Sequence, residues 1–291
     1  MANESPEYLR KLGELLVFHD IIATPDELTS ANLAELVTTF QEKKNLFVDG
    51  DPGRDTLWAL QSPWVASLPK QSLIECDADV VPGYEEGLSK TTLRADTAER
   101  FNSLRDEIHQ AGGFVTSDGG LRALTADVNQ NRSPTSMHYT GLAFDLYTDS
   151  GFFKPDQDPF VITRGENTFW NVWCRATNGQ QRELNAIHWK NSSSGVDLFK
   201  TVSGKFVNFT ETCARHGFHP IGPRLPFTRA QNRVYLSAEW WHFQCNDLLI
   251  PKLSQFGIEL QKIKDYTPHF IETKGPAVWD HRKVIYGKNW H

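Results

Sequence analysis

SMHYTGLAFDL, residues 136–146, places a histidine and an aspartate seven positions apart, His138 and Asp145. The alternation of LAFDL, residues 142–146, predicts a strand whose apolar side chains face a core while Asp145 points to the opposite side. Gly141 allows a turn before this strand, which could bring His138 back over the same spot. A carboxylate and an imidazole that converge in this way predict a metal site.

The composition is that of a soluble globular protein with one or two domains. The chain has 291 residues, of which 39% are hydrophobic and 23% charged. Its net charge of -6 argues against a broad nucleic-acid footprint and against a basic membrane-binding face. No apolar run approaches the roughly 20 residues of a membrane span. The sequence does not indicate an oligomeric state.

The N-terminal stretch and the cysteines bear on where the protein works. MANESPEYLRKLGELL is amphipathic and carries acidic residues early, which is not typical of a secretory signal. The cysteines are far apart and form no CxxC pair, which disfavours a cysteine zinc site or a redox motif. One or two disulfides and four reduced core thiols remain equally open alternatives. The four positions are Cys76, Cys174, Cys213 and Cys245.

Residues 1–65 predict a small domain of three helices. Ser5-Pro6-Glu7 has the cap, proline and acid of a helix start, and Thr24 to Glu27 begins a shorter helix. Apolar residues repeat with a helical period from Leu33 to Phe40. SPWVASLPKQS, residues 62–72, contains two prolines and is expected to be a linker.

Residues 5 to 62 resemble the three-helix peptidoglycan-binding domain that is attached to many cell-wall hydrolases. Arg54 stands where that family usually has proline, and Pro52 where it has an apolar residue. The resemblance implies peptidoglycan as a partner; a helical cap without a ligand is the alternative. DGDPGRD also suggests a calcium loop, but it lacks the regular acid spacing and the closing glutamate. The matching positions are Phe40, Gln41, Leu46, Val48, Asp49, Gly50, Gly53, Thr56 and Leu60.

Residues 66–291 predict a second domain of class α+β with an antiparallel sheet. Asp96 to Glu99 has the pattern of a helix start, and the apolar stripe that follows ends at Gly112-Gly113. Phe114 to Thr116 then predicts a strand. In residues 149–208 aromatic patches alternate with polar turns, which predicts short strands and loops. This segment could be an insertion into the domain.

A zinc hydrolase needs three protein ligands and an open position for water. The best third ligand after His138 and Asp145 is His242 in AEWWHFQ, where Glu239 precedes it by three residues. Glu239 could then act on a water whose pKa zinc lowers to about 7. A regular strand would direct Glu239 and His242 to opposite faces, so the backbone is expected to bend there.

The segments SxHxxGxAxD and ExWH together resemble the signature of the M15 peptidases. They occur in the expected order as Ser136 to Asp145 and Glu239 to His242. That family includes D-alanyl-D-alanine carboxypeptidases, VanY- and VanX-type D,D-peptidases and phage L-alanyl-D-glutamate endopeptidases. The resemblance implies one zinc held by His138, Asp145 and His242, with Glu239 as the catalytic base.

The resemblance covers about residues 75 to 247 and also implies substrate contacts. The family has an arginine upstream of the first histidine. Arg122 in SDGGLR fits this position, although more residues separate it from Ser117 than in the family pattern. Arg122 would stabilise the oxyanion or hold a substrate carboxylate. Ser136 and Trp240 are expected along the substrate groove, although Trp240 and Trp241 also suit core packing. The implied reaction is hydrolysis of a peptide bond next to a D-amino acid in murein.

Several alternatives accompany this interpretation. HFQ after the tryptophans favours a phage-type endopeptidase (an endolysin), whereas EWWH favours the D,D group. A third possibility is a non-catalytic wall-binding protein with a relict zinc site. The intact Glu239 argues against this third possibility. His216 and His219 have metal-like spacing, and no GxSxG or Cys/His motif supports a nucleophilic enzyme. A wall enzyme would be periplasmic, secreted, or phage-encoded and released at lysis. The other single histidines are expected to be surface or core residues: His109, His188 and His269.

Overall fold

The computed structural model describes residues 4–124, 126, 132–189, 198–228 and 234–264, and the fold is α+β as expected. The chain divides into two compact units. The helical unit contains the described residues 4–71 and 249–264, and the mixed unit contains residues 72–248. The sequence-based boundary at residue 65 placed residues 249–264 with the peptidase, whereas here they pack with the N-terminal helices.

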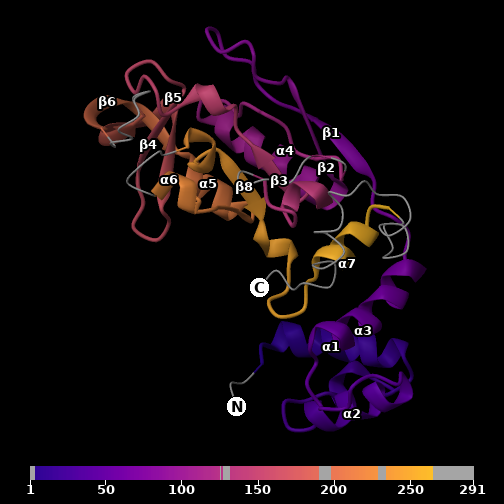
Figure 1. Ribbon diagram of the computed structural model, residues 1–291. Helices are drawn as coiled ribbons and strands as arrows, with labels where there is room; N and C mark the ends of the chain where they lie inside the picture. The colour runs from indigo at the N-terminus through magenta and orange to yellow at the C-terminus, as the bar shows by residue number, and fades with distance from the viewer. Residues whose placement is uncertain (1–3, 125, 127–131, 190–197, 229–233, 265–291) are drawn as a thin grey trace. The chain divides into compact units, whose positions relative to one another are not determined.

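The described part of the helical unit consists of α-helices and connecting loops (Figure 1). Its helices are α1 (Pro6–Phe18), α2 (Leu33–Lys43), α3 (Arg54–Ser67) and α7 (Phe256–Gln261). The helices expected at Ser5 and at Leu33 to Phe40 are present as α1 and α2, the short one expected at Thr24 is the 3-10 helix Pro25–Glu27, and α3 is a further α-helix. The Ser5 side chain caps α1 by accepting from the Tyr8 amide at 3.2 Å, and Pro6 occupies the first turn. Leu12, Leu15 and Leu16 are fully buried.

Gln41 organises the Asp49-Gly50 loop of the helical unit. Its side chain is 1% exposed and donates to Asp49 Oδ1 at 2.8 Å and to Thr56 Oγ1 at 3.1 Å. Its Oε1 accepts from the amides of Asp49 and Gly50 at 3.1 and 2.9 Å. A buried amide that is fully hydrogen-bonded fixes a loop in one conformation. Gln41 thus stabilises the loop between α2 and α3.

The expected linker at residues 62–72 is partly wrong, because α3 continues through Pro63 to Ser67. Proline removes one hydrogen bond from a helix interior. Burial of Val65, which is 1% exposed, and packing of Trp64 on the unit's core favour the continued helix. Leu253, 3% exposed, joins the same core, and Gln61 donates to the Leu253 carbonyl at 3.0 Å.

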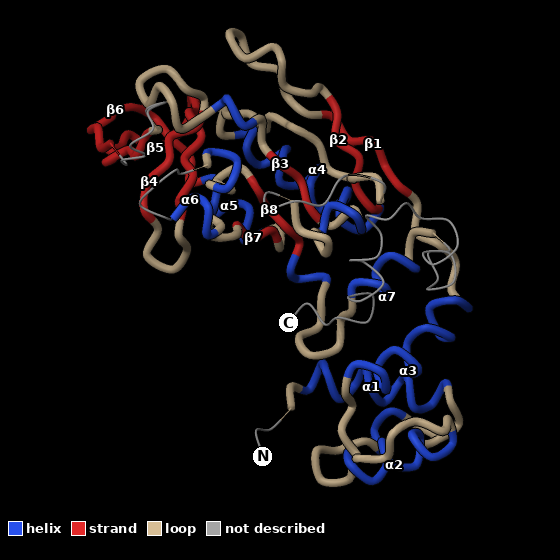
Figure 2. Tube along the Cα trace, viewed as in Figure 1, coloured by secondary structure: helices blue, strands red, loops and turns tan. Residues whose placement is uncertain are grey.

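The described part of the mixed unit holds three antiparallel sheets and three α-helices (Figure 2). The two-stranded sheet pairs β1 (Leu73–Asp77) with β2 (Lys90–Arg94). The second sheet has the order β3 (Ala143–Asp145), β8 (His242–Cys245), β7 (Phe218–Pro220). The third has the order β4 (Phe160–Arg164), β5 (Trp170–His188), β6 (Leu198–Asn208). The helices are α4 (Ala95–Gln110), α5 (Phe209–Arg215) and α6 (Leu225–Thr228).

The short strand β3 is fixed in place by an aromatic core. Phe144 is fully buried, and its ring contacts Phe101 of α4, Phe218 of β7 and Phe243 of β8 at centroid distances of 4.9, 5.1 and 5.7 Å. Leu146 is buried as well, as the alternation predicts. The core thus holds the apolar face of β3 and leaves Asp145 on the other side.

Two sequence-based expectations for the mixed unit are wrong. Phe114 to Thr116 forms no strand, because Val115 bonds instead to the backbone and carboxylate of Asp79 at 2.8 and 2.7 Å. Residues 149–208 contain one long strand rather than short ones only, since β5 has 19 residues. The register of β5 shifts between Arg175 and Gln180, and polar residues at this shift interrupt the strand pattern.

Candidate metal centre

The three proposed ligands come together at one end of the β3–β8 pair. Asp145 and His242 are directly paired across the two strands. His138 belongs to the 3-10 turn Met137–Thr140, which ends at Gly141 with a φ of 69°. A Cβ at Gly141 would lie 2.7 Å from the Arg94 nitrogen, so glycine is needed both for the left-handed backbone and for the close approach.

The ligand atoms lie within bonding reach of a single ion. Asp145 Oδ2 is 3.1 Å from His138 Nε2, and Asp145 Oδ1 is 2.9 Å from His242 Nδ1. The two ring nitrogens are 3.1 Å apart. All three ligand atoms lie within 4.8 Å of one another, and both histidines are buried. The group could therefore hold a metal ion.

The outer nitrogens of the two histidines favour a cation at this point. His138 Nδ1 is 2.6 Å from the Gly120 carbonyl, and His242 Nε2 is 3.3 Å from Gln244 Oε1. Both partners are acceptors, so each outer nitrogen can donate its proton there, and the inner nitrogen next to Asp145 can then bind a metal ion in place of a proton. Two buried imidazoles and a partly buried carboxylate that converge in this way could hold a metal ion.

The charges of the cluster support an ionised carboxylate. Burial alone would raise the pKa of Asp145, but the adjacent His138 and His242 hold it well below its usual range. Burial lowers the pKa of His242, yet the hydrogen bond and charge of Asp145, with a smaller effect of Glu239, raise it overall. Asp145 is thus held in the charged form that a metal ligand requires.

Glu239 lies next to the cluster on a bent backbone. Its φ is 57°, and the His242 amide donates to the Glu239 carbonyl at 3.2 Å, which closes a turn just before β8. The bend that the spacing of Glu239 and His242 predicts is therefore present. Glu239 is 5% exposed and lines the same pocket as the ligands without being one of them.

A pocket of about 360 Å³ opens over the cluster. Arg122 and Ser136 line it, in the places where substrate contacts are expected. Trp240 does not line it and is fully buried; its Nε1 donates to the Tyr235 hydroxyl at 3.1 Å. The expectation for Trp240 is corrected to Trp241, whose position after the turn faces the pocket. The other lining residues are Arg132, His138, Asp145, Thr148, Arg224, Leu236, Glu239 and His242.

The stretch SDGGLR runs along β3 and carries Arg122 to the pocket. Asp145 exchanges backbone hydrogen bonds with this stretch, donating to Gly119 O and accepting from Asp118 N, both at 2.9 Å. The Arg122 amide donates to the His138 carbonyl at 3.0 Å. A Cβ at Gly120 would lie 2.4 Å from the Thr92 carbonyl, which explains the second glycine.

Sequence patterns did not reveal every residue of the pocket. Arg224 forms an ion pair with Glu239, and Arg132 and Thr148 also line the pocket. Arg224 stands in GPRLP, and an arginine between prolines carries no motif or periodicity. The sequence therefore contains no indication that Arg224 contacts Glu239.

The alternative metal pair of the sequence, His216 and His219, is engaged elsewhere. His216 Nε2 is 2.8 Å from Glu107, and His219 Nε2 is 3.0 Å from Asp247. His109 pairs with Asp79 at 2.7 Å, while His269 lies outside the described residues. All four cysteines are buried and free of disulfide bonds, which agrees with the alternative of four reduced core thiols.

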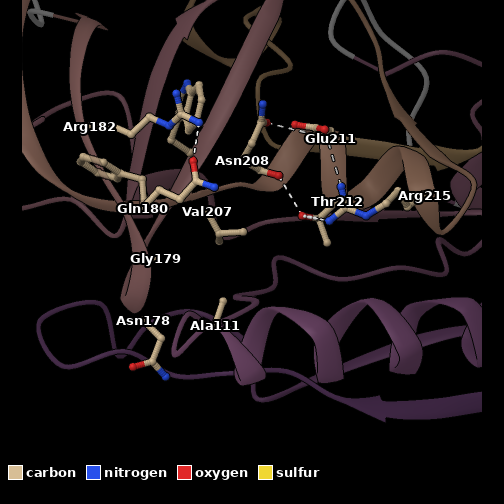
Figure 3. A pocket seen from close by; sticks show the side chains of 12 residues that line it. Ala111, Asn178, Gly179, Gln180, Arg182, Val207, Asn208, Glu211, Thr212 and Arg215 are labelled. Atoms are coloured by element: carbon tan, nitrogen blue, oxygen red, sulfur yellow. Dashed lines mark hydrogen bonds and ion pairs between the residues drawn. The ribbon is translucent and has the colours of Figure 1, made fainter.

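A second pocket of the mixed unit lies apart from the ligand cluster. Figure 3 shows Ala111 and Asn178 on one side of it and Val207 and Thr212 on the other. Its polar side chains bind one another; for example, Arg182 donates to Gln180 Oε1 at 2.5 Å. It contains none of the proposed catalytic or metal residues.

Neither family models, nor curated proteins, nor solved structures match this chain. Among the helices of the described residues, none has the length and apolar character needed to cross a membrane.

Proposed function

We propose that this chain is a zinc-dependent peptidase that hydrolyses a peptide bond next to a D-amino acid in the stem peptides of peptidoglycan. The observation that carries the proposal is the convergence of His138, Asp145 and His242 in a pocket that also contains Glu239. The choice of murein rests on the resemblance of the two motifs to the M15 peptidases. The mixed unit, residues 72–248, nearly coincides with the range of that resemblance.

Zinc suits the site because two imidazoles and one carboxylate are a common ligand set for a catalytic zinc that keeps an open position. When bound, zinc would act as a Lewis acid and lower the pKa of water to about 7. The ligand residues would be His138, Asp145 and His242, with Gly120 and Gln244 orienting the two rings.

Glu239 would act as the general base and then as the general acid. It would take a proton from the attacking water and return it to the nitrogen of the leaving amine. Its place in the pocket but outside the ligand group suits this role. Arg122 would bind the carbonyl oxygen as negative charge develops on it, or a carboxylate of the substrate.

The helical unit would bind peptidoglycan and keep the enzyme at its substrate. Support comes from the resemblance of residues 5 to 62 and from the Asp49-Gly50 loop, which Gln41 fixes in one conformation. A fixed loop binds a ligand at a lower cost in conformational entropy than a variable one.

The test is digestion of purified sacculi with the zinc-loaded protein, followed by mass spectrometry of the muropeptides. A D,D-peptidase removes a terminal D-alanine or opens a cross-link, whereas a phage-type endopeptidase cuts between L-alanine and D-glutamate. The intact Glu239 supports a catalytic protein over a wall binder. Binding to sacculi without any cleavage product would reject the peptidase proposal.

A further inference from the structure

Glu239 is in contact with Arg224. Arg224 Nε forms an ion pair with Glu239 Oε1, and both residues line the pocket over the ligand cluster. The Glu239 side chain is only 7% exposed and that of Arg224 26%. Because solvent screens this pair less than a surface pair, removing one partner should disturb the other.

Arg224 is attached to a well-anchored segment. Its amide donates to the Ser237 carbonyl at 2.8 Å, two residues before Glu239. Three residues later Phe227 is 1% exposed, and its ring contacts Trp170 with a centroid distance of 5.7 Å. The backbone that carries the guanidinium is thus tied both to the aromatic core and to the chain next to Glu239. The backbone position from which the Arg224 side chain reaches Glu239 is therefore fixed.

Both the backbone and the side chain of Glu239 need contacts with their surroundings to keep one conformation. Its positive φ is uncommon for a residue with a side chain and persists only where the surroundings enforce it. A glutamate side chain also loses considerable rotamer freedom when it is fixed. A general base must nevertheless stay within hydrogen-bond reach of the proton that it takes.

We infer that Arg224 is a positioning residue for the catalytic base: its guanidinium holds the Glu239 carboxylate in one orientation in the pocket. The inference rests on the proposed function, because it assigns Arg224 a role through Glu239. The competing explanation is that Arg224 binds the substrate directly, as proposed for Arg122. The two explanations differ in whether the effect of Arg224 depends on Glu239.

A double-mutant cycle separates the two explanations. Hydrolysis of a soluble murein stem peptide is measured for wild type, Arg224→Ala, Glu239→Gln and the double variant, each with its zinc content. Arg224→Ala should lower kcat by up to about 10²-fold, the scale of a small misplacement, with KM and zinc content nearly unchanged. The double variant should be no slower than Glu239→Gln alone.

A matched control and a chemical rescue sharpen the test. Arg215 is also paired with a glutamate, Glu107, but at an exposed surface position, and Arg215→Ala should leave kcat unchanged. Added guanidinium ion should restore part of the activity of Arg224→Ala and none of that of Glu239→Gln. Arg224→Lys should retain an intermediate rate, because lysine keeps the charge but not the planar fork.

A readout without activity uses the same four proteins free of metal. Urea denaturation midpoints should shift less in the double variant than the sum of the two single shifts, which reports the contact itself. A midpoint shift in the double variant equal to the sum of the two single shifts would show that the two side chains are not in contact. Additive losses of rate, or a raised KM in both backgrounds, would overturn the positioning role while leaving the peptidase intact. A wild type inactive on every murein substrate would instead overturn the proposed function and this inference together.

Discussion

His138, Asp145 and His242 each direct one possible ligand atom to the same place, while Gly120 and Gln244 lie next to the outer nitrogens of the two rings. At the scale of single residues, this convergence is the strongest indication that the group could hold a metal ion.

The first prediction concerns metal content. The protein should bind one zinc ion per chain, and His138→Ala should lose it, because two remaining ligands hold zinc poorly. Metal analysis by mass spectrometry after dialysis against zinc gives the answer. His219→Ala is the control, since His219 pairs with Asp247 and should not affect the zinc content. Full zinc occupancy in His138→Ala would remove His138 from the ligand set.

The second prediction concerns Arg122. Arg122→Ala should lower kcat by about 10²–10³-fold if the guanidinium stabilises the oxyanion. It should raise KM with little change in kcat if the guanidinium grips a substrate carboxylate. Steady-state kinetics on a stem peptide distinguish the two cases. Arg182→Ala, in the second pocket, serves as the control, and unchanged kinetics of Arg122→Ala would place Arg122 outside the reaction.

The sequence was informative about single residues wherever a motif fixed their spacing. The ligands and Glu239 are a few positions from Gly141 or from the turn before β8, so local spacing carries their geometry. Arg224 meets Glu239 only through tertiary structure, and the turn decides that Trp241 rather than Trp240 lines the pocket, although both rings are buried in the core. Such contacts between distant segments have no local pattern.

At the scale of secondary-structure elements, local chemistry predicted helix starts better than strands. Ser5 and Pro6 mark the start of α1 through a side-chain cap. The glycines after α4 mark its end, where Gly112 has a φ of 72°. By contrast, the length of β5 depends on its pairing with β4 and β6, and α3 passes Pro63 because burial outweighs a lost hydrogen bond. Tertiary packing therefore decided the elements that the sequence misplaced.

Asp79 joins several elements of the mixed unit and gives the third prediction. Burial would raise the pKa of Asp79, but the Val115 amide, His109 and Arg105 together lower it. A lowered folded pKa means that the stabilisation is present above the unfolded value of about 3.9 and is lost as pH falls through the folded pKa. Asp79→Asn should be less stable at pH 7 by about 1–3 kcal/mol, the scale of a charged hydrogen bond.

Urea denaturation from pH 7 down to pH 3 tests this prediction. The stability difference between wild type and Asp79→Asn should shrink in the acid range, because protonation removes the same charge from the wild type. Asp106→Asn, at an exposed position of α4, should follow the wild type at every pH. A difference that stays constant in acid would show that the charge of Asp79 is not the source of the stabilisation.

At the scale of the whole molecule, the chain divides in a way that sequence alone did not indicate. Residues 249–264 follow the last strand of the mixed unit but pack with α3 in the helical unit, where Leu253 joins the core. Their apolar residues would fit many surfaces, and only the folded chain shows which one they cover. A deletion of residues 1–65 would therefore expose Leu253 and its neighbours.

The fourth prediction uses this division. A fragment of residues 72–248 should cleave small soluble stem peptides about as fast as the full chain, because it contains the pocket and all proposed site residues. It should bind insoluble sacculi more weakly, since the helical unit is missing. Cosedimentation with sacculi measures the second property, and circular dichroism verifies the fold of the fragment. Equal sedimentation of both proteins would count against a wall-binding helical unit.

The most direct test of the account compares the wild type with Glu239→Ala on a murein stem peptide, with zinc measured in the same samples. Glu239 lies outside the ligand group, so the variant should keep one zinc per chain and its fold. Its rate of peptide-bond hydrolysis should fall by about 10²–10⁴-fold, the usual contribution of a positioned acid–base group. Wild-type activity in zinc-loaded Glu239→Ala would contradict the account.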